Sequence, residues 1–247
     1  ESLGLNDSFL VQYGRYLNGL FHGNLGTSLQ SRQPILDEIR VRFPNTVNLT
    51  IGSMLVAVLI GVPLGIISAI KRNSMLDYLA TTTALFGVSI PNFWLGIMLI
   101  LVFAVNLGWF PTGGMTHWFY TPTGLKQIIL PSIALGGRIA AIFMRLSRSA
   151  MLEVMQSDYI RTARAKGVKE RVVIWIHAFK NALTPLITVF GTNFGALLGG
   201  AMITEQVFAI NGLGRYMINA IYVRNYPAVQ SAVLVFAVSF ILITLIV

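Results

Sequence analysis

The sequence has little charge. Only 11% of its 247 residues are Asp, Glu, Lys or Arg, whereas 55% are hydrophobic and the mean hydropathy is +0.70. Soluble domains usually carry about 25% charged residues. The composition therefore argues against an ordinary soluble domain and predicts a membrane protein.

Cysteine is absent, and there are only three histidines. A disulfide framework, a thiolate metal site and a thiol nucleophile are therefore excluded for these 247 residues. His22, His117 and His177 are far apart and fall on different predicted sides of the membrane, so we expect no metal site. No nucleophile, base and metal ligands converge in the sequence, and we assign no catalytic residue.

No glycine is followed by a lysine, so the phosphate-binding pattern Gly-x-x-x-x-Gly-Lys-Ser/Thr is absent. We therefore expect no cofactor on this chain. The net charge of +9 and the pI near 10.2 could suggest a nucleic-acid binder. The basic residues lie beside apolar stretches instead, which indicates contact with membrane lipid and no nucleic-acid partner.

Five apolar stretches have the length of about 20 residues that crosses a bilayer as a helix. We place these spans at about 46–70, 78–105, 127–146, 182–204 and 228 to the end. The predicted fold is all-α, a polytopic transmembrane helical bundle. The chain begins in polar sequence and ends at Val247 inside an apolar run, so we expect both ends to be edges of a longer protein.

The distribution of charge predicts the orientation of the spans. Residues 145–180 carry eight basic and three acidic side chains, a net charge of +5, and the positive-inside rule places the loop at about 148–180 in the cytoplasm. Alternation then places residues 1–45, 107–126 and 207–226 outside. The first 45 residues hold four basic and four acidic side chains, which suits an outer segment.

The outer segment, residues 1–45, precedes the transmembrane domain that we expect over residues 46–247. It includes a candidate short helix at 34–42, with proline at its first turn and Ile35, Leu36 and Ile39 on one face. We expect this helix to lie along the membrane surface. The pattern is compatible with a packing spacer before the first span and with a docking surface for an external protein.

The basic loop contains a helix-prone stretch that is interrupted by Gly167, a predicted helix end. From composition alone it is a solvated positive-inside loop. However, Tyr159-Ile-Arg-Thr-Ala-Arg-Ala-Lys-Gly167 and the following His177-Ala-Phe-Lys-Asn-Ala-Leu-Thr-Pro185 resemble the cytoplasmic coupling loop of binding-protein-dependent ABC importer permeases of the dipeptide/oligopeptide branch.

The resemblance extends along most of the chain. It includes Gly61-Val-Pro-Leu-Gly65, Ser89-Ile-Pro-Asn-Phe-Trp-Leu-Gly96, Gly212-Leu-Gly-Arg215 and Asn225-Tyr-Pro-Ala-Val-Gln230. The wider permease signature begins with Glu-Ala-Ala and places its Leu-Pro closer to the glycine. Here Arg161-Thr162-Ala163 stands in its place, and Pro185 lies eighteen residues beyond Gly167.

The resemblance implies a type I ABC importer permease in a bacterial or archaeal cytoplasmic membrane. The family has a further span before the outer segment and a chain end beyond Val247. The implied partners are a second homologous permease, two cytoplasmic ATPase subunits that bind ATP and Mg, and an extracytoplasmic solute-binding protein. The implied ATPase-coupling residues are Asp158, Tyr159, Arg161, Thr162, Ala163, Arg164, Ala165, Lys166 and Gly167.

Two charged residues lie in or next to the predicted spans, where ionisable side chains are costly and so are candidates for function. Arg138 lies near the middle of the third span, and Glu205 at the outer end of the fourth. Both are pathway candidates. Arg138 could instead be a buried structural arginine bonded to backbone carbonyls, and Glu205 an interfacial carboxylate in water.

Small residues at helical spacing predict close helix packing. Gly61 and Gly65 lie on the first span, and Gly191, Gly195 and Gly199 on the fourth. The face on the fourth span could meet the partner permease or line the pathway, or could pack within the subunit.

Peptides are the expected substrate, with glutathione, a nickel complex or an oligosaccharide as alternatives within the same transporter class. An ion channel or ion-coupled carrier would need rings of charge or acidic residues inside the spans, and only Arg138 is clearly there. An intramembrane enzyme would need converging catalytic groups, which are missing.

Overall fold

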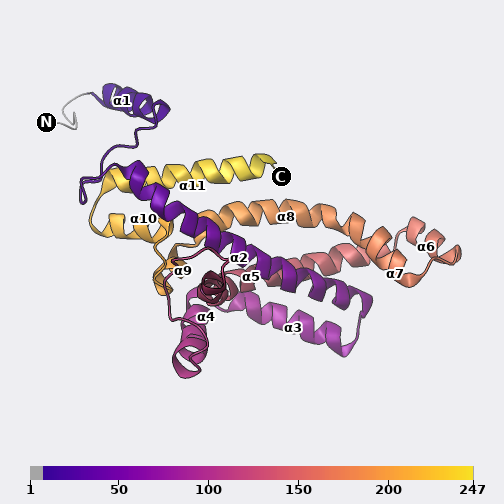
Figure 1. Cartoon of the computed structure of the whole chain (residues 1–247). Helices are drawn as coiled ribbons and strands as arrows, with labels where there is room; N and C mark the ends of the chain where they lie inside the picture. The colour runs from indigo at the N-terminus through magenta and orange to yellow at the C-terminus, as the bar shows by residue number, and fades with distance from the viewer. Residues whose placement is uncertain (1–7, 247) are drawn as a thin grey trace.

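The computed structural model describes residues 8–246, and Figure 1 shows a bundle of long helices. In the described residues the regular structure is helical, apart from one isolated bridge between Thr27 and Pro34. The elements are α1 (Phe9–Phe21), α2 (Ile35–Ile70), α3 (Met75–Ser89), α4 (Asn92–Leu99), the π-helix η1 (Ile100–Asn106), α5 (Pro122–Met155), α6 (Asp158–Ala165), α7 (Glu170–Val172), the π-helix η2 (Val173–Ala178), α8 (Phe179–Gly200), α9 (Met202–Val207), α10 (Leu213–Tyr222) and α11 (Tyr226–Ile246).

Four stretches are long and apolar enough to cross a membrane. They are α2, α5, the run Glu170–Gly199 and α11. The bent pair of α3 with α4 and η1 makes a fifth when it is counted as one span. The all-α membrane fold predicted from hydropathy is therefore confirmed.

The first span differs from the prediction. Residues 34–42 do not form a separate surface helix, because α2 continues without a break from Ile35 to Ile70. Pro44 and Pro63 lie inside this helix. Each proline removes one backbone donor, but the surrounding turns keep their bonds when neighbouring helices hold the segment in place. Ile35 and Ile39 are buried against α10 and α11.

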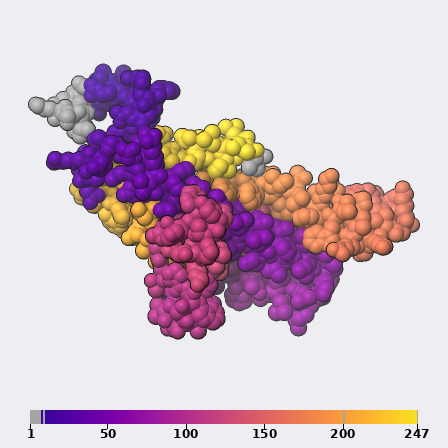
Figure 2. Space-filling model, viewed as in Figure 1, coloured from indigo at the N-terminus to yellow at the C-terminus, as the bar shows by residue number. Residues whose placement is uncertain are grey.

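The second predicted span, 78–105, is not a single straight helix. It is bent by 102° between α3 and α4. The break falls at Ser89-Ile-Pro91, where Ile90 is extended with φ −78° and ψ 126°. Proline disfavours the helical conformation of the residue before it, which explains the position of the break. In Figure 2, α4 and η1 stand out from the bundle, with a notch between them and α3.

The remaining predicted spans lie inside longer helices. The third span, 127–146, is the middle of α5, which continues past Arg145 and Arg148 to Met155. The fourth, 182–204, begins earlier in the run from Glu170 and gives way to α9 at Met202. The fifth corresponds to α11, and Val247 lies outside the described residues, as do residues 1–7 of the outer segment.

Helices α2 and α5 form the centre of the bundle and touch through glycines. A Cβ placed on Gly61 would lie 2.3 Å from the Ala140 carbonyl oxygen, and one on Gly65 would lie 2.4 Å from the Met144 carbonyl oxygen. In return, a Cβ on Gly136 would lie 2.4 Å from the Ser53 carbonyl oxygen. The two backbones therefore approach as closely as small residues allow.

The long helices give the molecule two ends (Figure 1). We call the end that holds α6 and α7 the α6 end, and the opposite end, which holds α1, α9 and α10, the α10 end. At the α10 end, the Asn225 side chain donates a 2.8 Å hydrogen bond to Ser28, and Ser231 donates to the Leu25 carbonyl at 3.1 Å. These bonds tie the segment before α2 to the start of α11.

We predict that Gly61→Ala destabilises the fold by about 1–3 kcal/mol, because the new methyl group would press on the α5 backbone. The matched control is Gly199→Ala, since a Cβ on Gly199 meets nothing within 4 Å. Alanine is the better helix former by about 1 kcal/mol, so the control should be neutral or slightly stabilised. Thermal unfolding of the two variants in detergent tests this, and equal unfolding temperatures would contradict it.

Candidate functional site

The loop predicted to couple to an ATPase is built around α6. Its helix ends at Gly167, which has φ +77°. The Val168 amide donates to the Ala163 carbonyl at 3.2 Å, and the Gly167 amide donates to the Arg164 carbonyl at 2.9 Å. This pair of bonds is the Schellman motif, in which a residue in the left-handed conformation closes a helix. Glycine adopts that conformation without steric cost, which explains Gly167.

One side of α6 is fixed and the other is open. Ile160 is fully buried in an apolar cluster that includes Ile66, Met151 and Val173 from three other elements. The remaining predicted coupling residues are exposed, except Ala163, which is partly buried: Asp158, Tyr159, Arg161, Thr162, Arg164, Ala165, Lys166 and Gly167. A single apolar anchor therefore holds a basic helix against the ends of α2, α5 and η2.

Two polar contacts set the direction of the loop. The Arg164 guanidinium donates to both carboxylate oxygens of Glu170, at 3.1 and 2.7 Å, and this hydrogen bonding raises the pKa of Arg164. The Asn181 side chain donates to the Tyr159 hydroxyl at 2.9 Å, which in turn donates to the His177 carbonyl at 3.4 Å. The start of α6 is thus joined to η2 and α8, and its end to α7.

A buried ion pair lies near the same end of the molecule. The Arg148 Nε and terminal nitrogen donate to the two oxygens of Asp77 at 2.7 and 2.8 Å, which joins α5 to α3. The Ser68 hydroxyl of α2 also donates to Asp77, as does the Asn73 amide at 2.9 Å. The Asp77 side chain is only 3% exposed. Three helices therefore meet at one carboxylate.

Arg138 lies on an open face of α5. Its side chain is exposed and lines two adjoining pockets of about 230 and 280 Å³. Asn92, at the start of α4, lines both pockets, while Thr204 lines one and Asn193 the other. Among the described residues Arg138 has no hydrogen bond or ion pair, so it is not the buried, carbonyl-bonded arginine that the sequence left open.

Glu205 is placed differently from Arg138. It is fully buried, and its carboxylate accepts a 2.6 Å hydrogen bond from the Thr46 hydroxyl and a 2.8 Å bond from the Arg215 amide. The Thr46 oxygen accepts from the Leu213 amide at 2.8 Å. The carboxylate therefore binds the N-terminus of α10, where negative charge is favourable. It is neither an interfacial carboxylate in water nor a partner of Arg138, and its part in the pathway stays a prediction.

The predicted packing glycines of α8 divide into two groups. Gly191 and Gly195 are buried, and a Cβ on Gly195 would lie 2.8 Å from the ring of Phe240 in α11. Gly199 has open space around it. In the part of the chain that the structure describes, this face packs α8 against α11 of the same subunit at Gly195. Contact of this face with a partner permease stays a prediction.

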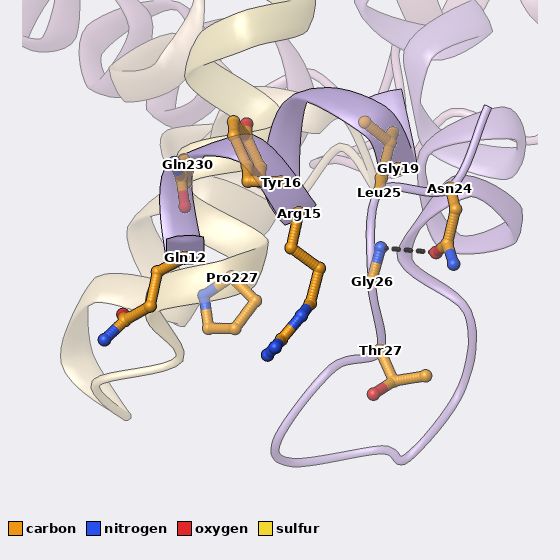
Figure 3. Close-up of a pocket in the computed structure, with 10 residues that line it drawn as sticks. All are labelled: Gln12, Arg15, Tyr16, Gly19, Asn24, Leu25, Gly26, Thr27, Pro227 and Gln230. Carbon is orange, nitrogen blue, oxygen red and sulfur yellow. Dashed lines mark hydrogen bonds between the residues drawn. The ribbon is translucent and has the colours of Figure 1, made fainter. Parts of the chain in front are cut away.

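A further pocket, of about 460 Å³, lies between α1 and the start of α11 at the α10 end (Figure 3). Arg15 of α1 points into the gap beside Pro227 of α11, and the Gly26 amide donates to the Asn24 side chain at 2.9 Å. The outer segment therefore presents a partly polar recess, but residues 34–42, for which a spacer and a docking surface were the alternatives, do not line it. No group of three metal-ligating side chains occurs within residues 8–246.

The comparisons with known proteins agree with this arrangement. Residues 61–247 match the family described as binding-protein-dependent transport system inner membrane component. The chain belongs to this family. The resemblance seen in the sequence is therefore confirmed, and the protein is a transport permease rather than an enzyme.

Relatives of the permease resemble it along its whole length. It is 47% identical to the dipeptide transport system permease protein DppB of Alkalihalophilus pseudofirmus, over 99% of this chain and 80% of the relative. It is 44% identical to the glutathione transport system permease protein GsiC of Salmonella paratyphi A, over 100% of this chain and 78% of the relative.

A solved structure shares the fold of the permease. The likeness to a chain of the MetNI methionine ABC transporter in an inward-facing conformation has a TM-score of 0.70, at 19% sequence identity. It covers 84% of this chain and 92% of that chain. At this level of identity, the likeness shows that the two chains share a helical fold.

Two side-chain contacts of the permease were not foreseen from the sequence. Arg148 was counted in the basic loop, and its pairing with Asp77, 71 residues away, was not foreseen. The signal that could have suggested a special role for Asp77 is Ser74-x-x-Asp77, a helix-capping pattern after a turn. The contact of Thr46 with Glu205 spans 159 residues and has no such local signal.

We predict that Asp77→Ala lowers the free energy of unfolding of the permease by about 3 kcal/mol, because it leaves Arg148 without its partner in a partly buried site. The matched control is Asp158→Ala, which removes an exposed carboxylate 3.7 Å from Arg161 and should change stability little. Denaturation of the purified permease measures both. Equal stability of Asp77→Ala and the wild type would show that the ion pair does not hold the three helices together.

Proposed function

We propose that this permease is the membrane-spanning subunit of an ATP-driven importer of di- and oligopeptides. The observation that carries the proposal is the structure of the loop around α6. This short basic helix is anchored by the buried Ile160, ends at Gly167 and is otherwise mostly exposed. Such a rigid protrusion suits a groove in a separate subunit. In this role α6 receives the movement of a cytoplasmic ATPase and passes it to α5 and α8.

The proposed complex contains two permeases, two ATPase subunits and an external solute-binding protein. ATP and Mg bind to the ATPases, and this chain holds no cofactor. The translocation pathway lies between this permease and its homologous partner. The apolar side chains that remain exposed on α3, α8 and α11 suit contact with lipid or with the second permease.

The proposed substrate is a small peptide, because the two relatives are named for dipeptide and glutathione transport. Glutathione is itself a short peptide with free carboxylates, and it is the second candidate because of the 44% identity to GsiC. Isolation of the complex from its native membrane tests the proposal. Recovery of two ATPases with a second permease, and of a binding protein that holds peptide, supports it. A binding protein that holds a nickel complex or an oligosaccharide would contradict the substrate.

The proposed orientation places the α6 end in the cytoplasm and the α10 end outside, in a bacterial or archaeal inner membrane. The absence of native cysteine makes this easy to test. Ser31 and Gln156 are exposed, one before α2 and the other between α5 and α6. We predict that an impermeant thiol reagent added to intact cells labels Ser31→Cys but labels Gln156→Cys only after permeabilisation. The reverse pattern would mean that the orientation is wrong.

We predict that Gly167→Val abolishes coupling without preventing folding. Valine does not adopt φ +77° cheaply, so the end of α6 should be redirected, while position 167 itself is exposed and does not contribute to the packing of the bundle. The variant should reach the membrane in normal amounts but lose at least about 90% of binding-protein-stimulated ATP hydrolysis and of uptake.

The control for this prediction is Gly167→Asn, because asparagine tolerates the left-handed conformation better than other non-glycine residues. Asparagine should restore a substantial part of the stimulated hydrolysis. Full stimulation with Gly167→Val in the reconstituted complex would show that α6 is an ordinary connecting loop and that coupling lies elsewhere.

A further inference from the structure

Arg138 occupies the middle of α5, which is the most deeply buried of the candidate spans in the described residues. It lies 16 residues from Pro122 and 17 from Met155, or about 24 and 26 Å from the two ends of α5 at 1.5 Å per residue. A charged side chain at such a depth faces a protein interior or a water-filled cavity, and normally pairs with a partner. Arg138 is exposed at the surface of this chain and has no partner among the described residues.

The described residues that line the pockets beside Arg138 are partly polar and partly apolar, and none of them carries a negative charge. The two pockets that it lines contain the side chains of Ser89, Asn92, Asn193 and Thr204, and no Asp or Glu. The carboxylate of Glu205, which follows the pocket residue Thr204 in the chain, is buried and bonded to Thr46 and to the backbone of α10. The two pockets therefore offer the guanidinium of Arg138 and the side-chain amides of Asn92 and Asn193. A negative charge to pair with Arg138 would have to come from a ligand or another subunit.

The broken span adds to the positive character of this place. Helix α4 begins directly at the pocket, and Pro91 at its N-cap gives no side-chain hydrogen bond to the first turn. The free amides of a helix start carry partial positive charge. Discontinuous helices near the middle of the membrane are a recurring way to present such groups to an anionic substrate in transporters. Because the span is bent by 102° at this place, the start of α4 lies at one of the pockets that Arg138 lines.

We propose that Arg138 binds a carboxylate of the peptide during its passage through the membrane, with Asn92 and Asn193 beside it. This inference rests on the proposed function. A guanidinium presents paired donors that match a carboxylate, and every peptide with a free C-terminus carries one. Because the pockets beside Arg138 are open, the contact should be weak enough for release, as transport requires.

The test measures the charge of the site and its occupation without relying on transport. Ala196 lines the same pocket as Arg138 and is exposed. Because the sequence contains no cysteine, a cysteine introduced there would be its only thiol. Ala196→Cys in the assembled complex is therefore treated with an anionic and with a cationic methanethiosulfonate reagent, and mass spectrometry confirms the modified residue. The ratio of the two rates is compared with the ratio after Arg138→Gln and after Arg138→Lys.

We predict that Arg138→Gln lowers the anionic-to-cationic rate ratio by at least about threefold, because the attraction of one reagent and the repulsion of the other both disappear. Arg138→Lys keeps the positive charge and should keep most of the ratio. Alanylalanine should slow the anionic reagent in the wild-type background, its C-terminal amide should not, and Arg138→Gln should remove this difference.

An unchanged ratio in Arg138→Gln would overturn the anion site, whether because an acidic residue of the second permease already neutralises Arg138 or because lipid covers it. Equal protection by alanylalanine and its amide, or protection by neither, would overturn the carboxylate as the ligand. ATP-driven uptake of alanylalanine by the wild-type complex is measured in parallel. If the wild-type complex does not take up alanylalanine, the proposed function is contradicted, whatever the result of the labelling at position 196.

Discussion

The close contact of α2 with α5 is the constraint on which the rest of the structure depends. Gly61, Gly65 and Gly136 leave room for backbone carbonyls of the other helix to approach where a Cβ would otherwise lie. Lipid offers little hydrophobic driving force between helices, so this contact relies on close packing. The helices α3, α4, α8, α9, α10 and α11 each contact at least one of the two.

Polar contacts reinforce the apolar clusters that attach other elements at the two ends of this pair. At the α10 end, Thr46 of α2 holds the Glu205 carboxylate and the first amide of α10. Toward the α6 end, Ser68 of α2 and Arg148 of α5 hold Asp77 of α3. Helix α5 then passes within two residues into α6. A movement of α6 would therefore reach α5 directly, and through the Arg148 contact it would reach α3.

The charges inside the bundle have different roles. Glu205 and Asp77 are buried and fully engaged by hydrogen bonds from their own chain, so they fix the arrangement of helices. Arg138 is the opposite case, because it is exposed at mid-depth, and the described residues that line its pockets include amides but no carboxylate. Stability explains the first two residues, whereas the unpaired guanidinium suits the binding of a ligand from outside the chain.

The spans and the end of α6 could be predicted from the sequence because both depend on local properties. An apolar run of sufficient length predicts a membrane helix, and a glycine after a basic amphipathic stretch predicts its end. The sequence alone could not distinguish Pro91, where the span bends, from the prolines that lie inside continuous helices, which are Pro44, Pro63, Pro131 and Pro185. Whether a proline breaks a span depends on which neighbours satisfy the freed backbone groups.

The pairing of Asp77 with Arg148 was also beyond sequence reasoning, because it needs two segments 71 residues apart to be placed together. The depth of Arg138 was predictable from its position in an apolar run, but the two pockets beside it, which no described Asp or Glu lines, were not. Both follow from the packing of α3, α4 and α8 around α5, which no local pattern encodes.

Transport by purified components measures the central claim most directly. The two permeases and two ATPases are inserted into lipid vesicles, with the binding protein and labelled alanylalanine supplied on the side of the α10 end. The account predicts accumulation of the dipeptide only when ATP is present on the side of the α6 end. Accumulation driven by an ion gradient in the absence of ATP would contradict it.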